Sequence, residues 1–134
     1  MLSFDELTTS LGVGDVIHFC EYKMDRHERL KLAMEIENGI VKEIFPPNTT
    51  LNRDQLIEIY GEELDDITYM TLSQSNCPRI LVSLGTDANG VEQVKMISIS
   101  KDFYNTKQQT LEVTGNMANI NYEPSYVLAQ GGWN

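Results

Sequence analysis

The stretch that decides the fold runs from Asp15 to Phe45 and reads DVIHFCEYKMDRHERLKLAMEIENGIVKEIF. From Leu30 to Glu37, apolar and polar side chains alternate with a period of two, which is typical of a strand with one buried face. Asn38-Gly39 follows and strongly favours a type I′ hairpin turn, so we expect another strand from Ile40 to Phe45. A helix ending at Gly39 is the competing interpretation, because Leu, Lys, Ala, Met and Glu all have high helix propensity. The alternation favours a pleated, mainly antiparallel meander.

The first part of this stretch predicts a register as well as a strand. A strand from Asp15 to Met24 and a turn at Asp25-Arg26 lead into the strand that begins at Leu30. In this register Cys20 faces Lys31, and His18 faces Ala33. The face that we expect to be buried then carries Ile17, Phe19, Leu30, Leu32 and Met34.

Both histidines and one cysteine lie in the same stretch, which raises the question of a metal or catalytic centre. In the expected register His27 lies about 20 Å from His18, too far for the two imidazoles to share an ion. His18 and Cys20 share a face, but two ligands are fewer than a zinc site needs, and the expected neighbours Arg29 and Lys31 are cationic. We therefore expect no metal ligands, no cofactor and no catalytic residues.

The rest of the chain predicts two short helices and further strands. Each helix follows a capping box flanked by leucines, and the helices are expected from Phe4 to Leu11 and from Arg53 to Tyr60. Gly61 is placed to end the second helix in a left-handed conformation. The remaining strand candidates are Thr68 to Ser73, Arg79 to Leu84, Val91 to Ser100 and Thr110 to Thr114.

These elements together predict an α+β fold. We expect a single domain over residues 1–119, in which a mainly antiparallel sheet, open or curled into a small barrel or roll, carries the two capped helices. Residues 120–134 have neither helical nor strand periodicity for long and are predicted to form a C-terminal extended arm.

Composition excludes several classes of function. The chain has 134 residues, enough for one core, and a formal net charge of −10, which disfavours direct binding to nucleic acid or to anionic membranes. No apolar run approaches the roughly 20 residues that span a bilayer. The two cysteines form no CxxC pair, so we expect reduced thiols and a cytoplasmic setting, or a virion if the protein is viral.

Two segments are candidate binding surfaces for other protein subunits, including further copies of the chain. Between Arg53 and Arg79 there is no basic residue, and a solvated surface is one interpretation of this run. The other is an acidic docking face formed by Glu58, Glu62, Glu63, Asp65 and Asp66. The arm offers aromatic anchors for a neighbouring subunit, or for its own domain, at Tyr122, Tyr126 and Trp133.

The leading functional hypothesis is a non-enzymatic structural or interaction subunit of a larger assembly, such as an accessory protein of a viral or phage particle. The alternative is a small acidic inhibitor or immunity protein that binds a basic partner; such binding would be tight, one to one and weakened by salt. An enzyme that uses scattered carboxylates is a third class. The sequence contains no GxGxxG, Walker A, GxSxG or HExxH motif to support it.

Overall fold

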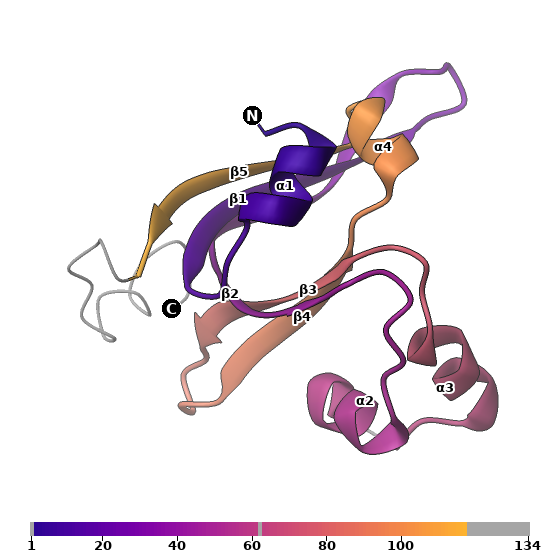
Figure 1. Cartoon of the computed structure of the whole chain (residues 1–134), viewed down its shortest axis with the longest axis vertical. Helices are drawn as coiled ribbons and strands as arrows, with labels where there is room; N and C mark the ends of the chain where they lie inside the picture. The colour runs from indigo at the N-terminus through magenta and orange to yellow at the C-terminus, as the bar shows by residue number, and fades with distance from the viewer. Residues whose placement is uncertain (1, 62, 118–134) are drawn as a thin grey trace.

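An open antiparallel sheet organises the molecule. The computed structural model describes residues 2–61 and 63–117, and within them five strands lie in the order β4-β3-β2-β1-β5 (Figure 1). Their bounds are β1 Asp15–Met24, β2 Leu30–Phe45, β3 Arg79–Thr86, β4 Glu92–Ser98 and β5 Gln109–Asn116. The α+β class is confirmed. The barrel is wrong, because the sheet does not close and β4 and β5 are its edges among the described residues.

Four short helices accompany the sheet in the described part of the chain: α1 Phe4–Ser10, α2 Arg53–Tyr60, α3 Asp66–Ser73 and α4 Lys101–Asn105. The first two were predicted, and both capping boxes are present. Gly61 ends α2 with a φ of 74°, as expected. The predicted strand from Thr68 to Ser73 is wrong, because the Asp65 side chain accepts a hydrogen bond from the Thr68 N–H and begins a helix there.

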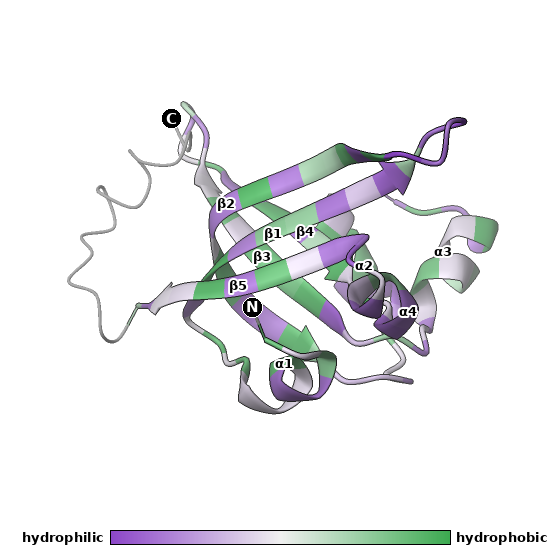
Figure 2. Cartoon of the chain, turned by 90° about the horizontal axis from the view of Figure 1, so that it is seen from above, coloured by the Kyte–Doolittle hydropathy of each residue, from purple (hydrophilic) through white to green (hydrophobic). Residues whose placement is uncertain are grey.

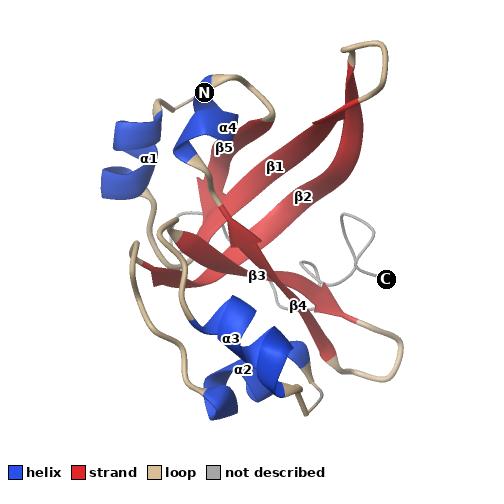
Figure 3. Ribbon diagram, turned by 90° about the vertical axis from the view of Figure 1, so that its right-hand side faces the viewer, coloured by secondary structure: helices blue, strands red, loops and turns tan. Residues whose placement is uncertain are grey.

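The helices cover opposite faces at opposite ends of the sheet. Figure 3 shows α1 and α4 beside the β5–β1 end, and α2 with α3 beside the β3–β4 end. Two clusters of buried apolar side chains result. The first contains Leu7, Phe19, Ile36, Ile80, Val82, Ile97, Ile99 and Leu111, and the second contains Phe45, Leu51, Leu56 and Leu81.

The β1–β2 hairpin turns through a longer loop than expected. Met24 pairs with Leu30, and the Asp25 carboxylate accepts hydrogen bonds from the backbone N–H groups of His27 and Arg29 at 2.8 and 2.9 Å. Glu28 supports the turn with a φ of 59°. The predicted register is therefore wrong: Cys20 pairs with Glu35 and not with Lys31.

Asn38-Gly39 does not turn the chain back, so the hairpin predicted there is wrong. β2 continues through both residues to Phe45, and the helix interpretation of this segment is wrong as well. Asn38 has a φ of 56°, and two residues of β2 stand opposite His18. This arrangement is a β-bulge, which uses the positive φ that Asn tolerates without reversing the chain.

A second bulge, at Ala33, reverses the face of the sheet to which the side chains of residues 30–32 point. β2 advances by two residues where β1 advances by one, from Glu21 to Tyr22. Leu30 and Leu32 are consequently 43% and 54% exposed, although the sequence predicted them to be buried with Ile17 and Phe19, which are buried.

No helix in residues 2–61 and 63–117 combines the length and apolar character needed to cross a membrane.

Candidate functional site

Three side chains of different chemistry converge on the face of the sheet opposite the first core. The Nε2 atom of His18 lies 2.6 Å from Oε2 of Glu35. The Cys20 Sγ atom lies 3.5 Å from the same His18 nitrogen and 3.7 Å from the same Glu35 oxygen. Within the described residues this is the group of His, Cys, Asp and Glu side chains whose ligand atoms could share one ion.

Strand geometry positions these residues. His18 and Cys20 are two residues apart in β1 and therefore project from the same face. Glu35 is the cross-strand partner of Cys20 in β2, and the bulges at Ala33 and Asn38 lie on either side of it. The sequence found the histidine and the cysteine but expected lysine and arginine beside them. It missed Glu35 because the loop after Met24 is longer than the assumed turn and the bulge at Ala33 shifts the pairing by one further residue.

Burial differs across the cluster. Cys20 is buried, whereas the side chains of His18 and Glu35 are each 36% exposed. Burial raises the pKa of the Cys20 thiol, and the nearby Glu35 charge raises it further. Hydrogen bonds with the Tyr22 and Thr110 side chains act in the opposite direction on that pKa. The cluster therefore combines a buried sulfur with two partly exposed side chains.

The arrangement does not suit nucleophilic catalysis. In a Cys-His-acid triad, one imidazole nitrogen takes the thiol proton while the acid orients the ring through the other nitrogen. Here Glu35 and Cys20 both meet His18 at Nε2. A raised thiol pKa also keeps the sulfur protonated, which lowers its reactivity.

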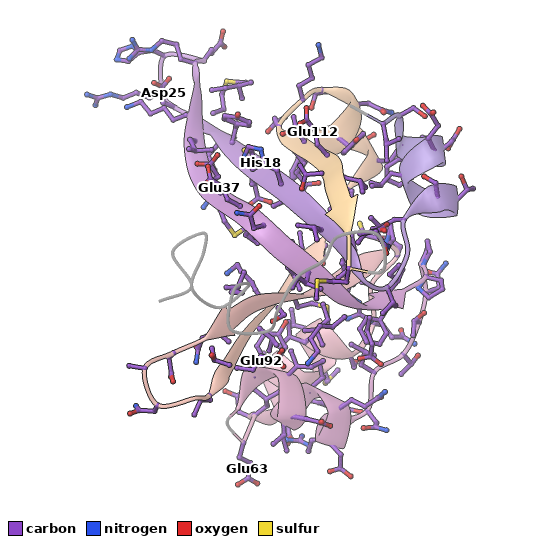
Figure 4. All side chains as sticks on the ribbon, turned by 90° about the vertical axis from the view of Figure 1, so that its left-hand side faces the viewer. His18, Asp25, Glu37, Glu63, Glu92 and Glu112 are labelled. Carbon is purple, nitrogen blue, oxygen red and sulfur yellow. The ribbon has the colours of Figure 1, made fainter. Side chains whose placement is uncertain are left out.

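Further carboxylates surround the cluster. Glu112 of the edge strand β5 is the cross-strand partner of His18, and Thr110 is the partner of Cys20. Figure 4 labels His18 on β1 with Glu112 and Glu37 on the strands to either side. The immediate field at the cluster is therefore negative, in contrast to the cationic neighbourhood expected from the sequence.

The predicted acidic face is partly occupied by local structure. Asp65 caps α3, and that hydrogen bond to the Thr68 backbone lowers the pKa of its carboxyl. Asp66 forms an ion pair of 2.7 Å with Arg53, whose guanidinium lies over the ring of Tyr69. Glu58 and Glu63 are exposed, and Glu62 lies outside the described residues.

Glu58 also lines a cavity of about 330 Å³ between α2 and the sheet. Its other charged lining residues are Lys42, Glu43 and Glu92, and Lys42 is ion-paired with Glu92. The cavity therefore presents excess negative charge. It lacks a second cation among its lining residues that could hold an anionic substrate.

The predicted arm cannot be compared with the structure, because Tyr122, Tyr126 and Trp133 lie outside the described residues. Comparison of the chain with models of protein families, with curated proteins and with solved structures finds no match.

Proposed function

We propose that this chain is a non-enzymatic subunit that assembles head to tail with further copies of itself. The observation that carries the proposal is the presence of complementary surfaces near opposite ends of the longest axis. The β1–β2 hairpin ends near the top of Figure 1, and α2 and α3 lie at the bottom. In Figure 4, Asp25 marks the first end and Glu63 the second.

The first surface, the ribbon tip, comprises residues 23–32. It is apolar as well as basic: Met24, Leu30 and Leu32 are 53%, 43% and 54% exposed. Figure 2 shows hydrophobic bands on β2 behind the hydrophilic loop. The tip contains four of the ten basic residues of the chain and only two acidic ones; the basic residues are Lys23, Arg26, Arg29 and Lys31. Exposed apolar side chains bordered by charges are typical of protein contacts.

The second surface, the helical end, comprises α2, α3 and residues 61 and 63–65 between them. Ile67 and Met70 of α3 are 80% and 72% exposed. Glu58 and Glu63 of the same surface are exposed as well. The helical end thus offers apolar contact area and a negative charge that matches the positive charge of the ribbon tip.

Contact between two different surfaces of the same chain is heterologous, and such contacts build rings or filaments. The net charge of −10 opposes random association, so attraction between the tip and the helical end selects one orientation. The apolar residues then supply the affinity. An inhibitor that uses only the acidic segment would leave the exposed tip without a role, and Asp65 and Asp66 already have partners within the chain.

A charge-reversal experiment tests the assembly. The tip-reversed variant carries Lys23→Glu and Lys31→Glu, and the end-reversed variant carries Glu58→Lys and Glu63→Lys. Each variant alone should remain monomeric in sedimentation velocity, because like charges then face each other. An equimolar mixture of the two should recover the assemblies of the unmodified chain, since both contacts become complementary again.

The matched control carries Lys95→Glu and Lys101→Glu, which change the net charge as the tip-reversed variant does but lie on β4 and α4. It should assemble normally. A monomeric unmodified chain at all accessible concentrations would overturn the proposal, as would assemblies that the tip-reversed variant still forms. Salt should slow association more than it weakens the final assemblies, because the contact is largely apolar.

A further inference from the structure

We infer that His18, Cys20 and Glu35 form a binding site for a single zinc-class divalent ion, with three protein ligands and a fourth position open to solvent. The site is independent of the proposed assembly. It departs from the expectation of no metal ligands, which depended on a register that would have placed Lys31 beside Cys20.

The donor set selects the class of ion. Imidazole nitrogen, thiolate sulfur and carboxylate oxygen are the three kinds of ligand that proteins use for zinc. Magnesium and calcium prefer oxygen ligands throughout, so a site with one oxygen, one nitrogen and one sulfur disfavours them. When the ion binds, Cys20 loses its proton to solvent, and the thiolate and the Glu35 carboxylate together balance the two positive charges.

Two of the three distances between the ligand atoms match those expected around a tetrahedral zinc ion. Zinc–sulfur bonds of about 2.3 Å and zinc–nitrogen or zinc–oxygen bonds of about 2.0–2.1 Å separate the ligands of a tetrahedron by about 3.5 Å. Cys20 Sγ lies 3.5 Å from His18 Nε2 and 3.7 Å from Glu35 Oε2. The third edge, from His18 to Glu35, is 2.6 Å because a hydrogen bond occupies it. Binding replaces that hydrogen bond with two metal–ligand bonds.

The backbone supports the site in a way that a chance pairing of surface side chains does not. The two bulges of β2 flank Glu35 and bring it opposite Cys20, and bulges are frequent beside functional sites because they redirect side chains. The side chains of Tyr22, on the same strand as Cys20, and of Thr110, on the neighbouring β5, contact the buried sulfur. The half-exposed His18 and Glu35 side chains leave a path for the ion.

Metal titration tests the site, and the chain supplies its own controls. Zinc binding is measured by calorimetry under reducing conditions, and cobalt serves as a spectroscopic probe. One ion per chain is expected, with a thiolate-to-cobalt charge-transfer band and the strong visible bands of tetrahedral cobalt. Cys20→Ser and Glu35→Gln should each weaken zinc binding by about 100-fold or more, since loss of a ligand exceeds the cost of losing an outer partner.

Two matched variants should leave zinc affinity unchanged: Cys77→Ser removes the other cysteine, and His27→Ala removes the other histidine. Glu112→Gln removes one negative charge beside the site without removing a ligand, and it should weaken zinc binding far less than either ligand substitution. Circular dichroism verifies that each variant is folded. If Cys20→Ser fails to fold, Glu35→Gln, which changes a half-exposed side chain, provides the same test.

Three outcomes would overturn the inference: no stoichiometric zinc binding, zinc affinity that survives both ligand substitutions, or equal loss in the control variants. The titration is read at a concentration where the unmodified chain is monomeric. Failure of the zinc site therefore leaves the assembly proposal intact, and failure of the assembly leaves the zinc site intact.

Discussion

Gly39 of β2 lies against side chains of the first core. A Cβ atom at this position would stand 2.6 Å from Cγ1 of Val82 and 2.8 Å from Cγ2 of Ile36. Both neighbours belong to the first core, so neither can move freely. We predict that Gly39→Ala destabilises the fold by about 1–3 kcal/mol through overpacking, measured by urea unfolding.

Gly12→Ala is the matched control for this prediction. Its Cβ atom would meet nothing closer than the Asp15 carboxylate at 4.0 Å. The substitution reduces the entropy of the unfolded chain without a steric penalty, so stability should be unchanged or slightly higher. Equal destabilisation by the two substitutions would show that close packing at Gly39 is not the cause.

The same position shows what a dipeptide can and cannot predict. Asn38-Gly39 indicates a positive φ, and Asn38 has one. Whether that φ reverses the chain or forms a bulge depends on the pairing of β2 with β3, which begins at Ile40. This long-range partner is not encoded in the two residues themselves.

At the scale of elements, several boundaries could be predicted from local signals. The bounds of β1 and α2 agree with the sequence-based expectation, because capping residues and alternation act within a few residues. Register is different. Around Phe19 the expected pairing and the observed one differ by an even number of residues, so both place Phe19 on the same face as apolar residues of β2, and alternation cannot distinguish them there.

This ambiguity in register determines which residue is expected beside Cys20 at the candidate site. The sequence predicted that His18 and Cys20 share a face and rejected them as metal ligands; a third ligand depends on which residue of β2 stands opposite Cys20. An Asp at position 25 that accepts two backbone hydrogen bonds stabilises a longer loop. That loop accounts for the pairing of Met24 with Leu30, but the bulge at Ala33 is also needed to bring Glu35 opposite Cys20.

α3 was missed for another reason. Its sequence, DITYMTLS, contains β-branched and aromatic residues, which favour strands, and none of its side chains is fully buried. The helix therefore depends strongly on its start, where the Asp65 side chain accepts from the Thr68 N–H at 2.7 Å. Capping here overrides the propensity of the segment.

The cap gives α3 a predictable dependence on pH. The hydrogen bond from the Thr68 backbone lowers the pKa of Asp65 below its ordinary value of 3.8. A carboxyl with a lowered pKa stabilises the fold above that ordinary value and loses its contribution as the pH falls through the folded-state pKa. Asp65→Asn keeps a capping oxygen but does not titrate. We predict that the unmodified chain is more stable than this variant at pH 7, and that the difference between their free energies of unfolding becomes smaller as the pH falls to 3.

Urea unfolding of the two proteins at each pH measures this difference. Other titrating groups such as Glu6 and Asp25, whose pKa values are also lowered by backbone hydrogen bonds, are common to both proteins and cancel. Asp65→Ala, which removes the cap altogether, should be the least stable of the three at pH 7. A constant difference between the Asn variant and the unmodified chain would contradict the assignment.

At the scale of the whole molecule, β3 connects two cores. Ile80 and Val82 project into the first cluster and Leu81 into the second. Arg79, which is also buried, donates to the carbonyl oxygens of Leu72 and Thr49 and ties the α3 layer to the sheet. A strand that is buried on both faces contains a run of apolar residues, here residues 80–82 within RILVSLGT. That run predicted the strand, but it did not predict which helices cover each of its faces.

Because both cores share β3, we predict that the described part of the chain unfolds as one cooperative unit. Leu56 in the second core is fully buried, and Leu7 in the first is 2% exposed. Leu56→Ala and Leu7→Ala should each cost about 2–5 kcal/mol, and each should lower the hydrogen-exchange protection of the slowest amides in both α1 and α2 by the same free energy. If Leu56→Ala instead lowered protection only in α2 and α3, those helices would open on their own, and the buried face that β3 presents to them would not couple the two layers.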